Sequence, residues 1–309
     1  MHGRNVRGIV RRVPHVVLIV NPYASAVDEH RIEVVERTLG RHADVRTVLT
    51  QHRGHATELA RSLADDVDAI FVYSGDGGFN EVVNGIAPDG PPLGCIPGGG
   101  TSVFPRALGI PRDPVQAAEH LAGLFAAKSV RRITVGRVNG RRFLFSAGLR
   151  FDAELVRRIE THRSRAGRPG DAAFLATMFK LLAEQRGRFE PVLEIEGLGR
   201  AAFLFVANAD PYTFLGRLPV RLAPEASLES GLDAMAPAVV GPTAVARLLA
   251  YAVSGRGLPR SALRVHDVDR IVVRCDRPLA LQADGEDLGD VDEAVFEAER
   301  AAVSVLAVR

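Results

Sequence analysis

A glycine-rich segment from Tyr73 to Gly85 is the strongest chemical signal in this sequence of 309 residues. Gly75, Gly77 and Gly78 follow an apolar run typical of a strand and precede a run with helical spacing. The segment therefore lies at the carboxyl edge of a sheet, where open α/β folds bind ligands. Glycines let backbone amides approach phosphate oxygens, and the start of the next helix adds its dipole. Asp76 indicates that a cation or a hydroxyl also binds there, although a tight turn remains the alternative interpretation.

Two further strand ends carry residues of the same kind. Gly98, Gly99 and Gly100 follow the next apolar run and precede a helix that opens at Val103, and Val20–Ser25 ends the first apolar run. The carboxyl ends of parallel strands meet at one edge of a sheet. The sequence therefore predicts that the three segments line one nucleotide cleft.

Asp284-Gly285-Glu286 is the third candidate for chemistry. An alcohol that accepts a phosphoryl group must lose its proton as the new bond forms, and a nearby carboxylate can take it. Taken alone, Asp284-Gly285 first indicates a hairpin turn between two strands.

The elements that would position these residues alternate between strand and helix up to about residue 130. A continuous apolar run such as His15–Val20 is typical of a strand buried on both faces of a parallel sheet. Asp28 and Asp113-Pro114 are helix-start signals. The predicted strands are His15–Val20, Val45–Leu49, Ala69–Tyr73 and Leu93–Ile96, and the predicted helices are Asp28–Leu39, His55–Leu63, Phe79–Ile86, one from Val103, and one from Asp113 to about Ala127. This alternation predicts a doubly wound α/β domain over residues 14–130.

The pattern changes near Arg131. Asn139-Gly140 separates two β-rich runs and is the strongest two-residue hairpin signal. The other predicted elements are helices at Ala153–Glu160, Asp171–Gln185 and Pro242–Ser254, and strands at Val192–Ile195, Ala201–Ala207, Leu263–Val265, Ile271–Arg274, Leu279–Gln282 and Ala302–Val308. Residues 131–309 are therefore predicted to form a mainly antiparallel β domain, with the boundary between about 128 and 133.

Composition excludes several classes of protein. Hydrophobic residues make up 47% and charged residues 25% of the chain, which is typical of globular proteins and not of disordered, collagen-like or coiled-coil chains. A net charge of +2 argues against a dedicated nucleic-acid binder. The lysines are Lys128 and Lys180, so a GxxxxGK[ST] phosphate loop is excluded. The absence of a GxGxxG fingerprint argues against a Rossmann oxidoreductase.

The compartment is inferred from cysteines and hydropathy. Cys95 and Cys275 lie far apart and cannot build a four-ligand zinc site, which favours a reduced, cytoplasmic compartment. No apolar run approaches the roughly 18 residues that span a bilayer. The sequence thus predicts a soluble protein or one peripheral to the inner face of a membrane.

On these residues the chain resembles the diacylglycerol kinase catalytic-domain family, which includes bacterial lipid kinases and sphingosine kinases. The resemblance runs from about residue 14 to the C-terminus, and its motifs are Asn21–Ser25, Thr50 with Gly54-His55-Ala56, Ser74–Gly85, Pro97–Pro111, Gly148–Asp152 and Asp284–Glu286. It implies a nucleotide domain related to 6-phosphofructokinase and NAD kinase, a β-rich lipid-binding domain, and an active site in the cleft between them.

The resemblance also implies roles for individual residues. Glu286 would be the general base for a lipid hydroxyl, and Asp76 would organise Mg²⁺ or polarise the acceptor. Arg106 is a further candidate for neutralising phosphate charge. Asp284 and Asn208 are candidates for binding the substrate, with a polar turn as the alternative for Asn208. The implied ATP contacts are Asn21, Pro22, Tyr23, Ala24, Ser25, Thr50, Gly75, Asp76, Gly77, Gly78, Phe79, Asn80, Glu81, Gly99, Gly100 and Thr101.

The sequence departs from the family pattern at several positions. Ser74 stands where the pattern has glycine, and Gly78 stands where it has threonine, so the hydroxyl at position 78 is lost while the backbone amide remains. The usual Gly-Thr-Gly-Asn of the second loop becomes Gly99–Ser102. Some bacterial members hold a structural metal with an aspartate before a glycine. The matching residue here is Ser230, with Glu229 and Asp233 as alternative ligands.

The activity implied is transfer of the γ-phosphate of ATP, with Mg²⁺, to a lipid hydroxyl, with diacylglycerol as the leading substrate and phosphatidic acid as the product. The alternatives are a kinase for another lipid such as a sphingoid base or glycolipid, an NAD kinase-like phosphotransferase, and a non-catalytic nucleotide- or lipid-binding homologue. The sequence leaves the oligomeric state open, with a homodimer among the alternatives.

A basic stretch suggests how the protein could meet a membrane. Its members are Arg157, Arg158, His162, Arg163, Arg165 and Arg168. They could contact anionic lipid head groups, at about 1 kcal/mol per charge, but a solvated helix face is the favoured interpretation. For the apolar residues from Phe174 to Leu182, a core-facing helix is favoured over a lipid-facing one.

Overall fold

The first half forms four parallel strands, of which three are almost fully buried and the one at the edge is partly exposed. The computed structural model describes residues 12–161, 171–257 and 262–308. The strands are β1 (His15–Val20), β2 (Asp44–Leu49), β3 (Ala69–Ser74) and β4 (Leu93–Pro97), in the order β4-β3-β1-β2. The predicted strands are confirmed, and three of them begin or end one residue beyond the prediction.

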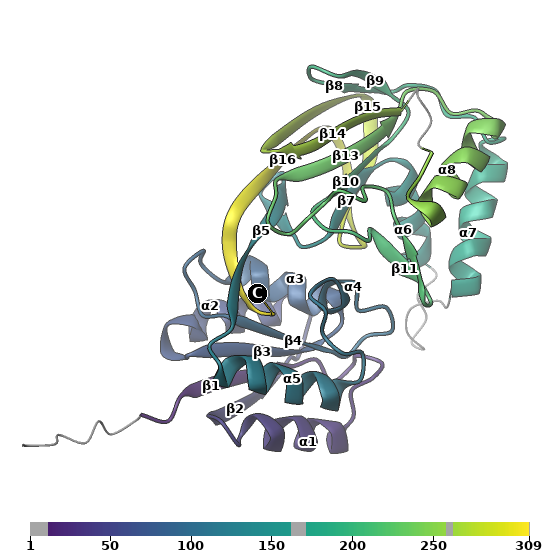
Figure 1. The fold of residues 1–309 in the computed structure, drawn as a ribbon. Coiled ribbons are helices and arrows are strands. Elements are labelled where there is room, and N and C mark those ends of the chain that lie inside the picture. Colours follow the sequence, from purple (N-terminus) through teal and green to yellow (C-terminus); the bar gives the residue numbers. More distant parts are fainter. Residues whose placement is uncertain (1–11, 162–170, 258–261, 309) are drawn as a thin grey trace, which may run out of the picture.

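Helices cover both faces of these strands, as predicted for a doubly wound domain (Figure 1). Helices α1 and α5 pack together on one side, and α2 and α3 on the other. The helices are α1 (Glu29–Leu39), α2 (His55–Leu63), α3 (Asp76–Gly85), α4 (Val103–Ala107) and α5 (Pro114–Ala126), with a 3₁₀ turn at Ala64–Asp66. Helix α3 begins three residues before the predicted Phe79, so Gly77 and Gly78 belong to its first turn.

The predicted helix starts are confirmed by their caps. The Asp28 carboxylate accepts a hydrogen bond from the backbone amide of Arg31 at 2.8 Å, and Asp113 accepts from the amides of Val115 and Gln116. Both carboxylates satisfy first-turn amides that have no partner within the helix.

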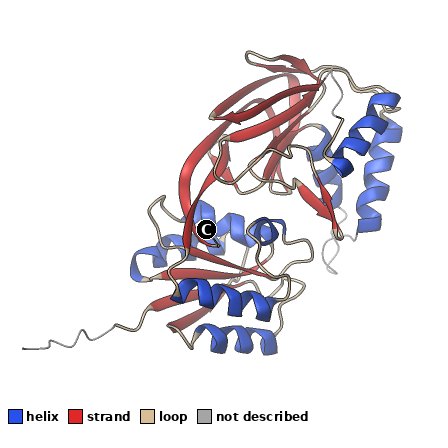
Figure 2. Ribbon diagram, viewed as in Figure 1, coloured by secondary structure: helices blue, strands red, loops and turns tan. Residues whose placement is uncertain are grey.

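The second half of the chain is dominated by strands, with three helices at one side (Figure 2). Its helices are α6 (Phe151–Thr161), α7 (Asp171–Glu184) and α8 (Pro242–Ser254). Its strands are β5 (Val130–Val138), β6 (Arg141–Phe143), β7 (Ser146–Leu149), β8 (Leu193–Ile195), β9 (Gly199–Ala201), β10 (Leu204–Ala207), β11 (Thr213–Leu215), β12 (Leu218–Val220), β13 (Leu232–Pro237), β14 (Ala262–Val268), β15 (Arg270–Ala283) and β16 (Glu286–Leu306). The mixed α/β class and the antiparallel character of this half are as predicted.

The predicted β5–β6 hairpin is confirmed. Asn139 and Gly140 both have positive φ, 47° and 89°, the backbone conformation that a type I′ turn requires. The hairpin places Arg141 and Arg142 next to helix α3, where the Arg142 guanidinium donates to the carbonyls of Val83 and Ile86.

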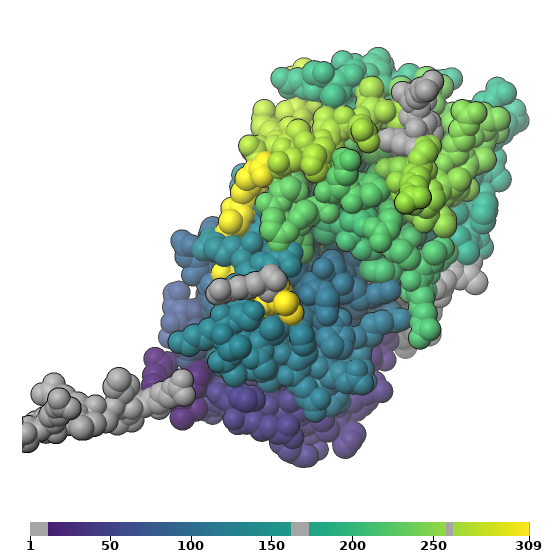
Figure 3. All heavy atoms as spheres, viewed as in Figure 1, coloured from purple at the N-terminus to yellow at the C-terminus, as the bar shows by residue number. Residues whose placement is uncertain are grey.

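Strand β16 joins the two halves. It pairs with β15 at its start and with β5 along much of its length, and Val305 near its end lies beside Leu93 of β4. Its ladder with β5 shifts register between Glu299 and Val303, and this irregularity separates the two halves of the strand. Figure 3 shows the C-terminal residues lying among those of the first half. One sheet of 14 strands therefore runs through the described part of the molecule.

Four of the predicted strands need correction. The predicted strand Ala201–Ala207 is divided into β9 and β10. The predicted strands at Ile271–Arg274 and Leu279–Gln282 are one strand, β15, whose ladder shifts register in a stretch that contains Pro278. Proline cannot donate a ladder hydrogen bond, and the strand passes it as an irregularity. The predicted Ala302–Val308 is only the end of β16, whose acidic, half-exposed first part carries no strong strand signal.

The hydrophobic core has one large cluster in each half. The first contains β1, β3 and β4 with the end of β16, and the second lies between the strands of the β-rich half. Helix α7 packs through Leu181 against Leu155 and Ile159 of α6, as the core-facing interpretation predicts, while Phe179 is exposed. Among the described residues, no helix has the length and apolar character needed to cross a bilayer.

Substitution of Gly94 in β4 tests how closely β4 packs against β3 and the end of β16. A Cβ atom added to Gly94 would lie 2.5 Å from Cδ1 of the buried Phe71 and 3.3 Å from Leu306 of β16. We expect Gly94→Ala to lower the free energy of unfolding by about 1–3 kcal/mol, because overpacking forces side chains out of their rotamers. Urea unfolding measures this. Gly123→Ala in α5, where a Cβ meets no atom within 4 Å, should instead stabilise by up to about 1 kcal/mol. A Gly94→Ala midpoint equal to that of the unchanged protein would contradict the prediction.

Candidate active site

A cavity of about 310 Å³ lies at the carboxyl ends of β1, β2 and β3. Thr50 directly follows β2, Asn21 follows β1, and their backbone amides donate to Val20 and Tyr73, which keeps these strand ends together. Of the residues predicted to form the site, those that line the cavity are Asn21, Tyr23, Thr50, Gly77, Gly78, Glu81 and Glu286. The structure thus brings together residues from both halves of the sequence, as the predicted interdomain cleft requires.

The other predicted nucleotide contacts lie in the same loops beside the cavity. The loop after β1 is fixed to the second glycine loop, because the amide of Ala26 donates to the Gly98 carbonyl at 2.9 Å. The Ala26 carbonyl accepts a hydrogen bond from the Tyr73 hydroxyl at 2.6 Å. The predicted contacts that do not line the cavity are Pro22, Ala24, Ser25, Gly75, Asp76, Phe79, Asn80, Gly99, Gly100 and Thr101.

Asp76 connects the two glycine loops. Its carboxylate oxygens accept hydrogen bonds from the backbone amides of Val103 and Phe104, each at 3.0 Å, and thereby cap helix α4. The loops also touch directly, since a Cβ atom on Gly99 would lie 3.0 Å from the Cα of Gly75. The role of Asp76 with Mg²⁺ or the acceptor stays a prediction; the geometry gives it a positioning role as well.

Three residues of the first loop have side chains that are buried or bonded to other parts of the protein. The side chains of Phe79 and Asn80 are buried, because the start of α3 at Asp76 turns them toward the core. The Glu81 carboxylate lines the cavity but accepts from the amides of Gly54 at 2.9 Å and Ala56 at 3.2 Å. It therefore caps helix α2, whose N-cap Gly54 has no side chain to do so.

Glu286 lies over the start of α3. A Cβ atom on Gly77 would be 3.9 Å from its Oε1. Two guanidinium groups hold its carboxylate: Arg53 contacts Oε1 at 3.0 Å and Arg141 contacts Oε2 at 2.5 Å. Neither arginine is among the site residues predicted from the sequence. The available signals were the position of Arg53 in the loop after Thr50, and that of Arg141 directly after the hairpin turn.

Asp284 is buried and does not line the cavity, and its contact with a substrate stays a prediction. Its carboxylate accepts hydrogen bonds from the amides of Leu144, Phe145 and Ser146 and from the Asn80 side chain, at 2.6 to 3.2 Å. Burial raises the pKa of Asp284 to about 6, while these hydrogen bonds act in the opposite direction. Asp284 thus fixes the β15–β16 turn, and with it the position of Glu286.

A second buried network supports the same turn and was not predicted. Gln282 accepts a hydrogen bond from the Gly285 amide at 2.9 Å and donates to Asp152 at 2.8 Å. The Tyr212 hydroxyl also contacts Asp152. Burial raises the pKa of Asp152 to about 6 against the hydrogen bonds from Tyr212 and Gln282.

Asn208 and Arg106 also serve the fold rather than line the cavity. Asn208 is fully buried, and its side-chain amide donates to the carbonyls of Thr134 and Leu144 at 2.8 and 2.9 Å. The Arg106 guanidinium lies 3.2 Å from the ring centre of Phe214 in β11 and donates to the Gly216 carbonyl. Asn208 thus links β5 to the segment before β7, and its contact with a substrate stays a prediction.

The alternative ligands for a second, structural metal are engaged with basic side chains. Glu229 contacts the Arg131 guanidinium, and the Ser230 hydroxyl donates to the Ser227 carbonyl. Asp233 contacts the His266 ring. The ion pair with Arg131 argues against Glu229 as a metal ligand, whereas Asp233 lies close to Glu225 and His266 in a group that could hold a metal ion.

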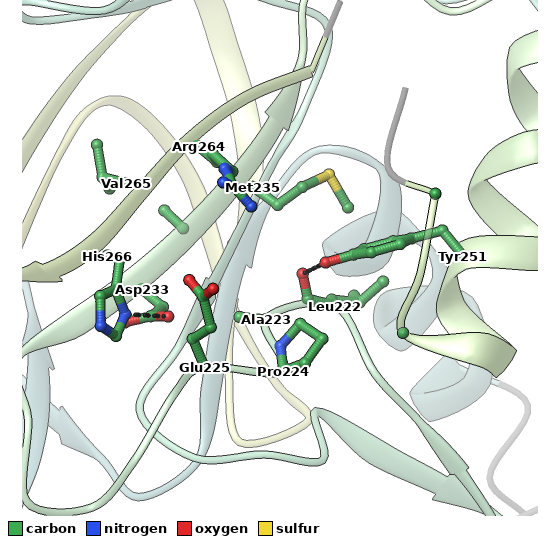
Figure 4. A pocket seen from close by; sticks show the side chains of 13 residues that line it. Leu222, Ala223, Pro224, Glu225, Asp233, Met235, Tyr251, Arg264, Val265 and His266 are labelled. Carbon is green, nitrogen blue, oxygen red and sulfur yellow. Dashed lines mark hydrogen bonds and ion pairs between the residues drawn. The ribbon is translucent and has the colours of Figure 1, made fainter. Parts of the chain in front are cut away.

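Another cavity, of about 370 Å³, lies between β13, β14 and the end of α8 (Figure 4). The buried Asp233 is hydrogen bonded there to His266 Nδ1 at 2.9 Å, and Glu225 points toward the same group. Met235 and Tyr251 supply an apolar side. The hydrogen bond and charge of Asp233 raise the pKa of His266 above its ordinary value.

Comparisons with known proteins agree with this arrangement. Residues 15–138 match the family model of the diacylglycerol kinase catalytic domain. A diacylglycerol kinase from Bacillus subtilis (strain 168) is 29% identical over 87% of this chain and 88% of its own length. A diacylglycerol kinase from Staphylococcus saprophyticus is 40% identical over 98 residues, 31% of each protein. A crystal structure of a diacylglycerol kinase from Bacillus anthracis (strain Sterne) has a TM-score of 0.70 at 23% identity, over 96% of this chain and 97% of that one.

Substitution of Asp284 tests its role as an anchor. We expect Asp284→Ala to lower the free energy of unfolding by about 3 kcal/mol or more, because it leaves three backbone amides without an acceptor and removes one of the two acceptors of the Asn80 side-chain amide. Urea unfolding measures the loss. The control is Asp89→Ala, an exposed aspartate paired with Arg132, which should change stability by about 0.5 kcal/mol or less. Equal losses for the two variants would rule the anchor out.

The Asp233–His266 pair predicts a dependence on pH. His266 should titrate above its ordinary pKa of about 6.5, because Asp233 favours the charged ring. A raised pKa means that the pair stabilises the fold below about pH 6.5 and that this contribution is lost as pH rises through the higher value. The chemical shift of the His266 ring in NMR gives the pKa directly. Asp233→Asn should bring it back toward 6.5, and an unchanged value in that variant would refute the assignment.

Proposed function

Residues 15–138 of this chain belong to the diacylglycerol kinase catalytic-domain family, and from this we propose that the protein is an ATP-dependent lipid kinase. Its proposed reaction transfers the γ-phosphate of ATP to the hydroxyl of diacylglycerol and yields phosphatidic acid. One observation carries the proposal: Glu286, from the second half of the chain, lies beside Gly77 in the glycine loop of the first half. A carboxylate and a phosphate-binding loop in one cavity are the two groups that phosphoryl transfer to an alcohol needs.

In this proposal, residues 14–130 bind the nucleotide and residues 131–309 bind the lipid and supply Glu286. The glycine loops at Gly75–Glu81 and Gly99–Thr101 approach the phosphates, with Asn21–Ser25 and Thr50 beside the nucleoside. Tyr23 supports this role, because its ring lines the cavity while 83% of the residue is exposed and free to cover a base. Backbone amides at the start of α3 would neutralise the phosphate charge.

The donor set suits Mg²⁺ bound with the nucleotide. Asp76 is a hard oxygen donor of the kind that Mg²⁺ prefers, and the amides of Val103 and Phe104, each at 3.0 Å, hold its carboxylate between the two glycine loops. When bound, Mg²⁺ would neutralise charge on the transferring phosphate. Asp76 would then hold the cation and the two glycine loops at fixed positions relative to each other.

Glu286 would act on the acceptor. The lipid oxygen forms the new bond to the γ-phosphorus, the bond from that phosphorus to the β–γ bridging oxygen breaks, and ADP leaves. The hydroxyl proton passes to the Glu286 carboxylate. Arg53 and Arg141 orient this carboxylate, and the Asp284 anchor and the Gln282–Gly285 hydrogen bond fix the turn from which it projects.

We also propose that the protein works in the cytoplasm, at the inner face of the membrane that holds its lipid substrate. The basic stretch offers limited support. Arg157 pairs with Asp287 and Asp290, and Arg158 pairs with Glu184. The other members of the stretch, His162, Arg163, Arg165 and Arg168, lie outside the described residues. Nothing in the proposal requires a nucleic acid, and a homodimer is compatible with it.

An assay with a panel of lipids and one variant tests the proposal. Purified protein is incubated with labelled ATP, Mg²⁺ and mixed micelles that contain diacylglycerol, a sphingoid base or a glycolipid, and with NAD as a soluble acceptor. We expect labelled phosphatidic acid. Glu286→Gln should lower kcat by about 10²-fold or more, because it removes the proton acceptor but keeps the shape of the side chain.

The control is Glu293→Gln, an exposed glutamate of the same strand that pairs with Arg274. It should keep normal turnover. Label on another acceptor would change the substrate and keep the reaction class. Normal turnover in Glu286→Gln would refute the general base, and ATP binding without transfer to any acceptor would favour a non-catalytic homologue.

A further inference from the structure

The hydroxyl of Ser74, at the end of β3, has an unusual environment. Ser74 is only 2% exposed, and its Oγ makes no hydrogen bond with any group in the described part of the chain. Buried polar groups nearly always have a partner, because an unpaired one loses its hydrogen bonds to water without replacement. A buried hydroxyl of this kind, lining a cavity, indicates a partner supplied by a ligand.

Gly78 lies so close to Ser74 that it has no room for a side chain. A Cβ atom added to Gly78 would lie 2.2 Å from Ser74 Oγ and 2.6 Å from Ser74 Cβ, which is closer than non-bonded atoms can approach. Gly78 lies in the first turn of α3 and is not among the residues with positive φ, so its backbone does not require glycine. The space taken by Ser74 is what requires it. Ser74 and a side chain at position 78 are therefore mutually exclusive.

The location of Ser74 identifies the chemistry of the ligand. Ser74, Gly77 and Gly78 line the 310 Å³ cavity together, with the first turn of α3. The Ser74 carbonyl accepts from the Gly98 amide at 2.7 Å, so the residue lies between the two glycine loops. Arg53, whose guanidinium is ion-paired with Glu286, lines the same cavity. Backbone amides, a helix start and an arginine favour an oxyanion with several oxygens.

We propose that the Ser74 hydroxyl donates a hydrogen bond to a phosphate oxygen of the bound nucleotide, and that Gly78 is the complementary gap that admits it. The inference rests on the proposed function, because it takes ATP as the ligand. It also changes the meaning of two departures from the family pattern. Considered alone, the glycine at position 78 removes the hydroxyl that the threonine of the family pattern would supply. In the structure Ser74 Oγ occupies the place where a side chain at 78 would begin, so the site keeps a hydroxyl that comes from the strand instead of the helix.

The first test removes the hydroxyl. ATP and inorganic tripolyphosphate are titrated into the full chain with Mg²⁺ by calorimetry, and Tm is measured with and without ATP. Ser74→Ala should weaken both ligands by the same factor, about tenfold or more, as expected for a hydrogen bond to a charged group. Its Tm without ligand should equal or exceed that of the unchanged protein, because Oγ has no protein partner to lose. A merely structural role predicts the opposite: a lower Tm and unchanged affinity.

The matched control is Thr134→Val. The hydroxyl of Thr134 is also buried and unpaired within the described chain, but Thr134 does not line the cavity. This variant should leave the affinity for ATP and tripolyphosphate unchanged.

The second test exchanges the two side chains. Gly78→Thr alone should lower Tm, because the new Cβ overlaps Ser74. Ser74→Gly alone should weaken ATP binding as Ser74→Ala does. The double variant Ser74→Gly/Gly78→Thr removes the overlap and returns a hydroxyl, so it should regain Tm relative to Gly78→Thr and ATP affinity relative to Ser74→Gly.

Each failure has a distinct meaning. If the unchanged protein binds ATP and Ser74→Ala binds it equally well, the inference is wrong and the proposed kinase function stands. If Ser74→Ala loses ATP affinity but not tripolyphosphate affinity, Ser74 does not contact a phosphate. If the double variant is no better than either single variant, the two positions are not complementary. If the unchanged protein binds no ATP, the proposed function fails and the inference fails with it.

Discussion

A single buried carboxylate holds the candidate site together. Asp284 accepts hydrogen bonds from three successive amides, those of Leu144, Phe145 and Ser146, and from the Asn80 side chain of helix α3. The glycine-loop helix, the β6–β7 segment and the β15–β16 turn therefore meet at one residue. Its four donors offset part of the cost of burying a charge. Glu286 lies two residues further on, so the distance between the carboxylate and the glycine loop depends on this contact.

Strand β16 carries that local constraint through the whole molecule. It leaves the Asp284-Gly285 turn beside β15, follows β5, and ends beside β4 in the core of the first half. The register shift after Glu299 lets one strand serve an antiparallel sheet and then a parallel one. Arg142 adds a second link, because its guanidinium bonds both Glu299 and the last turn of α3. Two halves of different architecture thus share one continuous backbone ladder.

Much of the first half could be predicted because its signals are local. The apolar run His15–Val20 is buried almost throughout, and Asp28 caps the helix that its position indicated. Only the end of strand β16 was predicted, because its first part is acidic and half-exposed and the strand is stabilised by partners distant in sequence. The roles of single residues were also predictable where the signal is local and not where it depends on distant partners. The glycine loops were found, whereas the structural duties of Asn80, Asn208 and Asp284 depend on backbone groups 60 or more residues away.

The two acidic residues of the first glycine loop, Asp76 and Glu81, have roles that depend on which backbone amides lie near them in the fold. Asp76 caps α4, whose N-cap Ser102 makes no side-chain cap, and Glu81 caps α2, whose N-cap is a glycine. The positive ends of two neighbouring helices are thus neutralised by side chains of α3. Helix α3 itself begins after Gly75, which offers no capping side chain. The described structure therefore satisfies α2 and α4 internally and leaves the start of α3 facing the cavity, where an anion in the cavity, such as the phosphates of ATP, can complete it.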